Sequence, residues 1–374
     1  MSALWTQVTL GSLCTMVKGT SPTLKTMSGP YPLVVTAEFR RSADSWQIEG
    51  PAVCIPLVSS TGHGDAAIHR VHYQEGKFAL ANLLVALMPK DSTVCNAKFL
   101  YYLLTAQKDT LLVPLMQGTA NVSLKDKDIA KVEILLPPLA KQQQIVARIE
   151  ELAAKIEEAQ RLRRQAVEEA EALCRSIIFK DPNAVLTPMC ELVRQKGHDV
   201  QVKADQTYHF AGVYCFGRGV FRGQKKSGID FAYKQLGQLK AGNFVYPKLM
   251  AWEGAFGVVP QECDGLFVSP EFPIFEVLEN RVLPETLDVY FRAPAVWPQV
   301  AGESTGTNVR RRRLNPKDFL AYKIPLPSME KQLQLRQVMQ QVDGLKRLQA
   351  ETTAELDAML PSILDKAFQG ELTK

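Results

Sequence analysis

The stretch "LLPPLAKQQQIVARIEELAAKIEEA", residues 135–159, leads from an apolar strand-like end through two prolines into a long charged helix. The stretch "IPLPSMEKQLQLRQVMQQVDGLKRL", residues 324–348, contains the same junction again. A shift of 190 residues aligns further identical pairs: Leu124 with Leu314, Asp128 with Asp318, Ile134 with Ile324, Pro137 with Pro327, Lys141 with Lys331, Gln142 with Gln332 and Gln144 with Gln334. Because solenoid repeats are only about 20–50 residues long, we expect two copies of a module made of a domain and a helix.

Both helices carry an apolar stripe with alternating steps of three and four residues, the pattern of a coiled-coil seam. The main seam positions are Ile145, Ile149, Leu152 and Ile156 in the first helix and Leu335, Val338, Val342 and Leu345 in the second. A single amphipathic helix most often packs on its own domain, and this alternative stays open. Because these helices are long, duplicated and charged on their other faces, we expect them to pair with each other, with Pro361 bending the second one near its end.

The prolines at each junction mark where a globular domain ends. We expect a first domain at 1–136, a spacer helix at 137–180, a second domain at 181–326 and a second spacer helix at 327–374. Each domain mixes short β-like runs (52–58 and 272–278) with one clear helical pattern (96–107 and 284–294). The predicted fold class is α/β (α+β): two similar mixed domains separated by two long helices that form an antiparallel coiled coil, with a pseudo-twofold internal repeat.

Composition excludes several classes of protein. At 374 residues the chain exceeds the about 250–300 residues at which single cores stop growing. Its longest apolar run, 78–89, is shorter than the ~20 residues of a membrane helix, and no signal segment is visible. Seven widely spaced cysteines, without a Cys-x-x-Cys pair, support neither a disulfide framework nor a zinc site. We expect a soluble, cytoplasmic protein without a metal centre.

Positive charge gathers in "YHFAGVYCFGRGVFRGQKKSG", residues 208–228, which contains no acidic residue. Its cations are Arg218, Arg222, Lys225 and Lys226, interleaved with glycines and with aromatic residues such as Tyr214, and Lys248 follows downstream. Lysine neutralises phosphates and arginine can bind guanine O6 and N7 bidentately, so the pattern indicates DNA binding. The alternative is a solvated basic hairpin whose aromatic side chains face the core.

Two further groups of cations are candidates for DNA contacts. Arg310, Arg311, Arg312 and Arg313 stand in a row just before the second junction. Such a run either contacts duplex phosphates, meets an acidic partner or is merely solvated. The candidates in the first domain lie on polar loops and are Lys25, Arg40, Arg41, His63 and Arg70. A lone histidine of this kind is more often structural than a ligand.

Motifs of catalysis are absent from the sequence. There is no Gly-x-x-x-x-Gly-Lys-Ser/Thr phosphate loop, no dinucleotide fingerprint after a strand and no Gly-x-Ser-x-Gly elbow. The Asn/Asp-Pro-Pro-aromatic motif that amino-methyltransferases use is also missing. We therefore predict that the chain has no active site and is not an enzyme.

The two junctions, "LPPLAKQQ" (136–143) and "IPLPSMEKQ" (324–332), resemble the central and C-terminal conserved regions of the specificity subunits of type I restriction–modification systems. "WTQVTLGSL" (5–13) resembles the usual start of their first target-recognition domain. "GNFVYPKLMAWEGAFGVV" (242–259) and "DGLFVSPEFPIFEV" (264–277) resemble the body of a second one. The resemblance covers essentially the whole chain, and it departs from the family pattern at Lys141-Gln142-Gln143, where a Glu-Gln pair is usual.

The resemblance implies two target-recognition domains on an antiparallel helix pair, each domain reading one half of a bipartite sequence in double-stranded DNA. It also implies two methyltransferase (modification) subunits and restriction/translocase subunits as partners. S-adenosylmethionine, magnesium and ATP would belong to those partners, so that no cofactor is expected in this chain.

Our hypothesis is a DNA sequence-recognition subunit in which Arg218 and Arg222 contact bases, while Lys225, Lys226 and the arginine run contact phosphates. Two alternatives remain at this point. One is a DNA nuclease or modification enzyme whose motif is not recognisable. The other is a coiled-coil scaffold that binds partners without base specificity.

Overall fold

The 190-residue shift between the two halves is visible in the order of their secondary-structure elements. The computed structural model describes residues 5–61, 64–119, 122–302 and 313–369. In the first half α3 (Asp126–Ile129), β10 (Glu133–Leu136) and α4 (Leu139–Phe179) follow one another. In the second half α7 (Pro316–Ala321), β21 (Lys323–Leu326) and α8 (Met329–Glu351) each begin 190 residues later. The predicted internal repeat is therefore confirmed.

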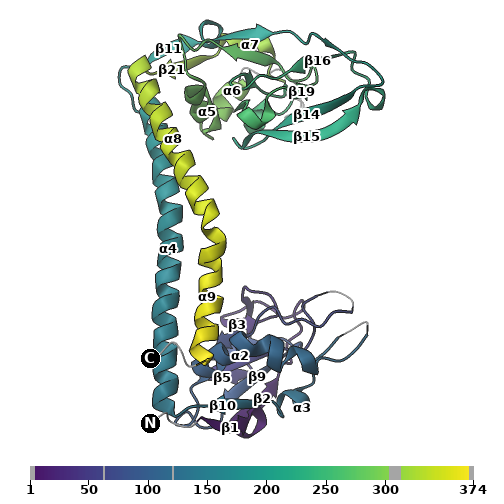
Figure 1. Ribbon diagram of the computed structural model, residues 1–374, viewed down its shortest axis with the longest axis vertical. Helices are drawn as coiled ribbons and strands as arrows, with labels where there is room; N and C mark the ends of the chain where they lie inside the picture. Colours follow the sequence, from purple (N-terminus) through teal and green to yellow (C-terminus); the bar gives the residue numbers. More distant parts are fainter. Residues whose placement is uncertain (1–4, 62–63, 120–121, 303–312, 370–374) are drawn as a thin grey trace. The chain divides into compact units, whose positions relative to one another are not determined.

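The chain divides into two units, each with one globular domain and part of the helical region (Figure 1). Unit 1 comprises Met1–Arg161 and Thr352–Lys374, and unit 2 comprises Leu162–Glu351. The 41-residue helix α4 contributes its first part to unit 1 and its last part to unit 2. Its ends lie inside the segment 137–180 that the sequence marks as a spacer helix.

The globular domain of unit 1 is built from short strands in two four-stranded sheets and one strand pair. The strands and short helices are β1 (Thr6–Thr9), α1 (Leu10–Leu13), β2 (Cys14–Lys18), β3 (Tyr31–Val34), β4 (Arg41–Ala43), β5 (Ile48–Glu49), β6 (Ala52–Pro56), β7 (His72–Gln74), β8 (Lys77–Leu80), β9 (Leu84–Pro89) and η1 (Val113–Leu115). The strand orders are β2-β9-β6-β7 and β4-β3-β8-β5, and β1 pairs with β10.

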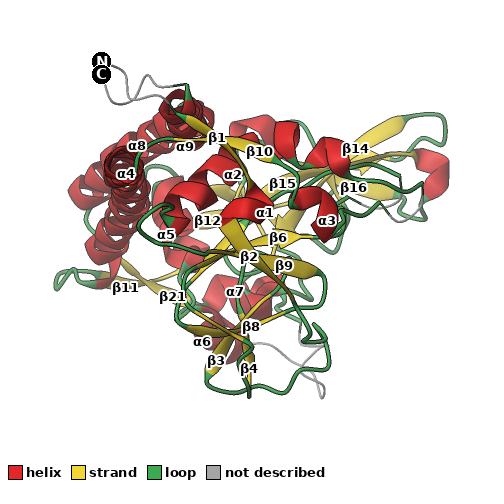
Figure 2. Cartoon of the chain, turned by 90° about the horizontal axis from the view of Figure 1, so that it is seen from below, coloured by secondary structure: helices red, strands yellow, loops and turns green. Residues whose placement is uncertain are grey.

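Helix α2 (Ala97–Leu111) covers one face of the β2-β9-β6-β7 sheet (Figure 2). It begins where the Asn96 side chain accepts a hydrogen bond from the Phe99 N–H at 3.0 Å, which satisfies one of the unpaired donors of the first turn. Its apolar side, including Phe99 and Leu103, packs with Val53 and Ile55 of the sheet. The helix predicted at 96–107 is therefore confirmed.

Unit 2 repeats the architecture with different strands. Its elements are β11 (Val185–Pro188), η2 (Met189–Glu191), β12 (Val193–Lys196), β13 (Val200–Gln201), β14 (Thr207–Tyr214), β15 (Gly219–Ser227), η3 (Gly228–Asp230), β16 (Gln235–Gln238), β17 (Phe244–Val245), η4 (Ala251–Glu253), β18 (Gly257–Val258), η5 (Gln261–Cys263), β19 (Phe267–Val268), β20 (Ile274–Val277), α5 (Pro284–Arg292) and α6 (Trp297–Gly302). The strand orders are β12-β20-β17-β18 and β13-β16-β19-β14-β15, and β11 pairs with β21. Helix α5 confirms the helical pattern at 284–294.

Aromatic side chains form the core of unit 2. Phe244 stacks on Phe319 with ring centroids 5.4 Å apart, and Phe291 and Phe256 pack against the same cluster. All four rings are fully buried. This core joins α5 and α7 to the β12-β20-β17-β18 sheet, so that the junction leading into α8 is fixed to the domain.

The helices pair in antiparallel fashion within each unit. In unit 2 the Lys346 Nζ of α8 lies 2.8 Å from Glu171 Oε1 of α4. Earlier in α8, Lys331 Nζ lies 2.6 Å from Asp181 Oδ1, which follows the end of α4. Since lower numbers of one helix meet higher numbers of the other, the two run in opposite directions. In unit 1, α9 (Thr353–Phe368) packs on the first part of α4.

The predicted seam positions divide between two kinds of contact. Ile145 and Ile149 are buried in the core of unit 1 together with Leu364 of α9, and Leu335 is buried in the core of unit 2. Each helix therefore packs on its own domain at its start, as the alternative reading held, in addition to its pairing. Further along, Ile156 and Val342 are buried, and Leu152, Val338 and Leu345 are partly buried.

The second spacer helix is interrupted at Thr352, and the bend expected at Pro361 stays a prediction. Helix α8 ends at Glu351, Thr352 has φ −99° and ψ 3°, and α9 begins at Thr353. Pro361 lies inside α9. The fixed φ of proline is close to the helical value, so α9 continues through this residue at the loss of one backbone hydrogen bond.

Candidate nucleic-acid interface

The basic stretch at 208–228 folds into one antiparallel hairpin, β14 and β15. On its outer face the Tyr214 and Phe221 rings stack with centroids 3.9 Å apart, and the Arg218 guanidinium lies over Tyr214 at 4.5 Å. Gly212 leaves room for this stack, because a Cβ at that position would lie 2.5 Å from the Phe221 ring. We call Arg218, Tyr214 and Phe221 the hairpin stack.

The turn that joins the two strands contains the one non-glycine residue with a positive φ among those that the structure describes. Phe216 has φ 62° and Gly217 has φ 65°. Their N–H groups donate to the carbonyl oxygens of Glu253 at 2.8 Å and Gly254 at 3.0 Å, which hold the strained turn in place. The Phe216 side chain is 64% exposed, and its ring lies 6.3 Å from the Trp297 ring. The sequence pattern includes Phe216 among the aromatic residues between the cations but gives it no role.

The other predicted cations of the hairpin lie exposed on β15. Arg222 pairs with Ala211 of β14, whereas Lys225 and Lys226 follow a register shift between His209 and Ala211. No side-chain partner of Arg222, Lys225 or Lys226 is found in the described part of the chain. The alternative reading is correct for Tyr208, which is buried against Phe231 and Phe267, and wrong for Tyr214.

Two cations predicted to bind DNA have partners within their own domain. Lys248 Nζ donates to the Pro270 carbonyl at 3.0 Å, and Arg313 forms an ion pair with Glu271. The Leu314 N–H also donates to the Lys248 carbonyl. These contacts attach the chain after residue 312 to the loop before β20. Arg310, Arg311, Arg312 and His63 lie outside the described residues, so their predicted roles stay predictions.

In the first domain the structure brings Arg40 and Arg41 together. Both line a polar cavity of about 510 Å³ with the hydroxyl groups of Thr23, Thr26 and Ser42 among its walls. Arg41 Nη1 donates to the Thr23 carbonyl at 2.9 Å and the side chain is otherwise exposed. The cavity combines positive charge with hydroxyl donors, the groups that bind a phosphate.

Arg40 itself is held by its surroundings. Its guanidinium donates to Gln74 Oε1 at 3.0 Å and to the Tyr73 carbonyl at 3.1 Å, and its Nη1 lies 3.2 Å from His72 Nδ1. Burial lowers the pKa of Arg40, and burial together with the charge of Arg40 lowers the pKa of His72 to about 4.

The remaining cations predicted for the first domain are exposed. Arg70 forms an ion pair with Glu38 at 3.1 Å. Lys25 lies exposed on the loop before β3.

A buried glutamine sits at the start of α4. The Gln142 Oε1 accepts the N–H of Asn96 at 2.8 Å, just before α2 begins. Its Nε2 donates to the carbonyls of Val94 and Pro137, each at 2.8 Å. The amide therefore joins three pieces of backbone: the residues before α2, the end of the domain and the first turn of the spacer helix.

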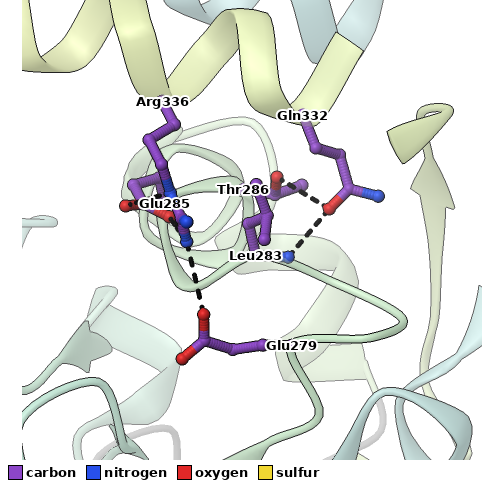
Figure 3. Close-up of polar contacts among 6 residues, drawn as sticks. All are labelled: Glu279, Leu283, Glu285, Thr286, Gln332 and Arg336. Carbon is purple, nitrogen blue, oxygen red and sulfur yellow. Dashed lines mark hydrogen bonds and ion pairs between the residues drawn. The ribbon is translucent and has the colours of Figure 1, made fainter. Parts of the chain in front are cut away.

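The second copy contains the same arrangement at the start of α8 (Figure 3). Gln332 Oε1 accepts the N–H of Leu283 at 2.8 Å and the hydroxyl of Thr286 at 3.3 Å. Its Nε2 donates to the carbonyls of Pro327 at 3.0 Å and Arg281 at 3.5 Å. The sequence aligns Gln142 with Gln332, but gave neither residue a role.

An ion pair joins each domain to its spacer helix, two turns after Gln142 in unit 1 and one turn after Gln332 in unit 2. The domain contributes the cation in one copy and the anion in the other. In unit 1 the domain supplies the cation, Lys98, which lies 2.5 Å from Glu150 of α4. In unit 2 the domain supplies the anion, Glu285, whose two oxygens lie 2.9 and 3.0 Å from Arg336 of α8 (Figure 3). Glu279 lies 3.5 Å from the same guanidinium. The hydrogen bond to Glu285 raises the pKa of Arg336, and that to Glu150 raises the pKa of Lys98.

Within the described ranges no group of three or more His, Cys, Asp or Glu side chains could hold a metal ion. The helices of those same ranges include none with the length and apolar character needed to cross a membrane.

Comparison with known proteins gives three findings. Residues 3–168 match the family model "Type I restriction modification DNA specificity domain". The specificity subunit of the type I restriction enzyme EcoBI from Escherichia coli is 27% identical over 155 residues, which is 39% of this chain and 30% of that protein. The match thus spans less than a third of the curated relative's length.

Among solved structures, the HsdS subunit from Thermoanaerobacter tengcongensis superposes with a TM-score of 0.55 at 20% identity, covering 99% of this chain and 98% of that one. A chain from work on complex assembly and conformational transition of the type I R-M system gives a TM-score of 0.61 at 20% identity, with 98% of each chain covered. These likenesses show the fold. Beyond the fold, the family match assigns a type I restriction modification DNA specificity domain to residues 3–168.

Proposed function

We propose that this chain is the DNA sequence-recognition subunit of a type I restriction–modification complex and that it recognises a bipartite target. The observation that carries the proposal is the hairpin stack. The Arg218 guanidinium lies over the Tyr214 ring at 4.5 Å, and its Nε donates to the Cys215 carbonyl at 3.2 Å. Its Nη1 and Nη2 groups have no partner among the described residues. A guanidinium fixed in this way can bind the O6 and N7 of a guanine with little loss of side-chain freedom.

Each globular domain would read one half of the target. The two modules would provide two separate DNA-binding domains. The helices that connect these domains would set the distance between the two half-sites. Helix α4, with 41 residues at ~1.5 Å per residue, is about 60 Å long, which exceeds one helical turn of DNA. A longer or shorter helix would therefore change the spacing of the target rather than its bases.

The exposed cations divide by role. Arg218 and Arg222 would contact bases of the second half-site, and Lys225 with Lys226 would neutralise backbone phosphates beside it. In the first domain Arg41 would contact a phosphate from the polar cavity that it lines. Lys248 and Arg313 have internal partners, so we assign them to holding the loop before β20.

The chemistry of the complex would belong to other chains. The partners proposed are two methyltransferase subunits and restriction/translocase subunits. They would bind S-adenosylmethionine, magnesium and ATP. In this proposal the chain acts as a non-catalytic subunit that directs its partners to a DNA sequence.

The test is to co-express the full chain with the methyltransferase subunit encoded beside it and to map methylated adenines in the host genome by single-molecule sequencing. We expect one motif made of two short blocks around an unspecified gap. A stable complex that methylates no defined motif would contradict sequence recognition and favour the coiled-coil scaffold. Cleavage or methylation of DNA by the purified chain alone would contradict the non-catalytic role and favour the enzyme.

A further inference from the structure

The two buried glutamines lie where a domain could otherwise turn on its helix. Gln142 and Gln332 are both fully buried and both stand on the first turn of a spacer helix. Each binds the N–H that precedes the domain's helix, α2 or α5, and the carbonyl of the proline that closes the junction. All corresponding partners are backbone atoms, so the contact depends on the path of the chain rather than on the identity of neighbouring side chains.

An amide suits this position better than an apolar side chain would. Water is excluded here, so a rotation of the domain would leave backbone N–H and carbonyl groups without partners and would be costly. Apolar contacts, by contrast, tolerate small rotations because they have no direction. The side-chain amides of Gln142 and Gln332 therefore fix the angle between each domain and its helix.

A second contact removes the remaining freedom. One anchored point still permits rotation about itself, but Arg336 holds Glu285 with two parallel hydrogen bonds one turn further along α8 (Figure 3). In unit 1 the ion pair of Lys98 and Glu150 lies two turns beyond Gln142 on α4, one turn further along than its counterpart on α8. Two contacts at different positions along one helix, the buried glutamine and the ion pair, fix the orientation of the domain relative to that helix.

We propose that Gln142 and Gln332 are positioning residues that set the spacing and rotational phase at which the two half-sites are read. This inference rests on the function proposed above. Adding one base pair between half-sites moves the second one by about 3.4 Å and turns it by about 35° around the duplex. Functional groups must be held to within about 0.5 Å and 10–20°. A domain fixed on its helix therefore cannot bind a half-site displaced by one base pair, whereas a domain that can rotate on its helix can.

The test compares Gln332→Met with Gln334→Met in the full chain assembled with its methyltransferase subunit. Methionine keeps the volume of glutamine and removes the amide, and Gln334 is an exposed glutamine on the same helix. Methylation rates are measured on duplexes whose half-sites are separated by the natural gap or by one base pair more or less. We expect Gln332→Met to reduce the preference for the natural gap by about tenfold, with no change for Gln334→Met. A Gln332→Met complex with the wild-type preference would overturn the positioning role.

Gln142→Met in the first domain is expected to reduce the same preference. If Gln332→Met yields no assembled complex, Arg336→Gln decides by the same measurement, because this side chain is 29% exposed and can be replaced without opening the core. The expected reduction is about threefold, and an unchanged preference would overturn the proposal. A wild-type chain that methylates no bipartite motif would instead refute the proposed function, so the two failures are distinguishable.

Discussion

Replacing Arg218 with alanine should relax specificity at one base pair of the second half-site and change little else. The Nε–H of Arg218 donates to the Cys215 carbonyl, so the N–H groups on Nη1 and Nη2 are available to bind a base. A good bidentate contact contributes about 1–3 kcal/mol of discrimination, which is a factor of about 5–150 between the right and the wrong base. The lost contact with the exposed Tyr214 ring would cost only about 0.5–1 kcal/mol of folding stability.

The assay is the methylation rate of the assembled complex on a set of duplexes in which every position of the second half-site carries each of the four base pairs. Arg218→Ala should flatten the preference at one position and leave the first half-site unaffected. Lys225→Ala is the matched control from the same hairpin. It should weaken binding to all sequences alike and reduce the salt slope by about one. The same base preference at every position in Arg218→Ala as in the wild type would refute the assignment of Arg218 to a base.

Three further outcomes are expected. Removing one heptad from α4 together with the matching part of its partner helix shortens the spacer by about 10 Å and should shorten the gap in the methylated motif by about three base pairs; an unchanged gap would exclude the spacer role. Lys98→Glu and Glu150→Lys should each lower the free energy of unfolding by about 0.5–1 kcal/mol, and the double reversal should restore it in urea denaturation; a double variant as unstable as the single ones would show that the pair contributes nothing. His72 has a pKa of about 4 when folded against 6.5 as an ordinary value, so the unfolded chain binds more protons between these values and stability should fall by up to about 2 kcal/mol as pH drops from 6.5 towards 4; a His72→Gln chain with the same pH dependence would contradict this.

The repeat and the helix bounds could be predicted because their signals are local. The prolines of each junction stop a strand, and the apolar stripes after them have the period of a helix, so α4 and α8 start where the sequence indicates. The interruption at Thr352 could not be predicted in this way. Thr352 also interrupts the apolar stripe, but the sequence predicts only a bend at Pro361 and gives no local signal for a helix end at Thr352.

The candidate site could be predicted only in part. Residues 208–228 were identified by charge, but which cations are available depends on partners distant in sequence. Glu271 pairs with Arg313 and the Pro270 carbonyl binds Lys248, contacts that no local pattern indicates. The hairpin stack likewise depends on the register of two strands, which brings Tyr214 beside Phe221. Gln142 and Gln332 were aligned by the repeat, but their burial follows only from the fold.

The different positions of the two ion pairs affect any exchange of globular domains between the halves of the chain. The repeat aligns Glu150 with Gln340 and Arg336 with Val146, so Lys98 transplanted onto α8 would lose its anion and Glu285 transplanted onto α4 would lose its cation. Chimaeras joined at the prolines would therefore leave both domains without their ion-pair partners. Chimaeras joined after Glu150 and after Arg336 would keep each domain with the first turns of its own helix. The segment that must be exchanged is therefore larger than the globular domain alone.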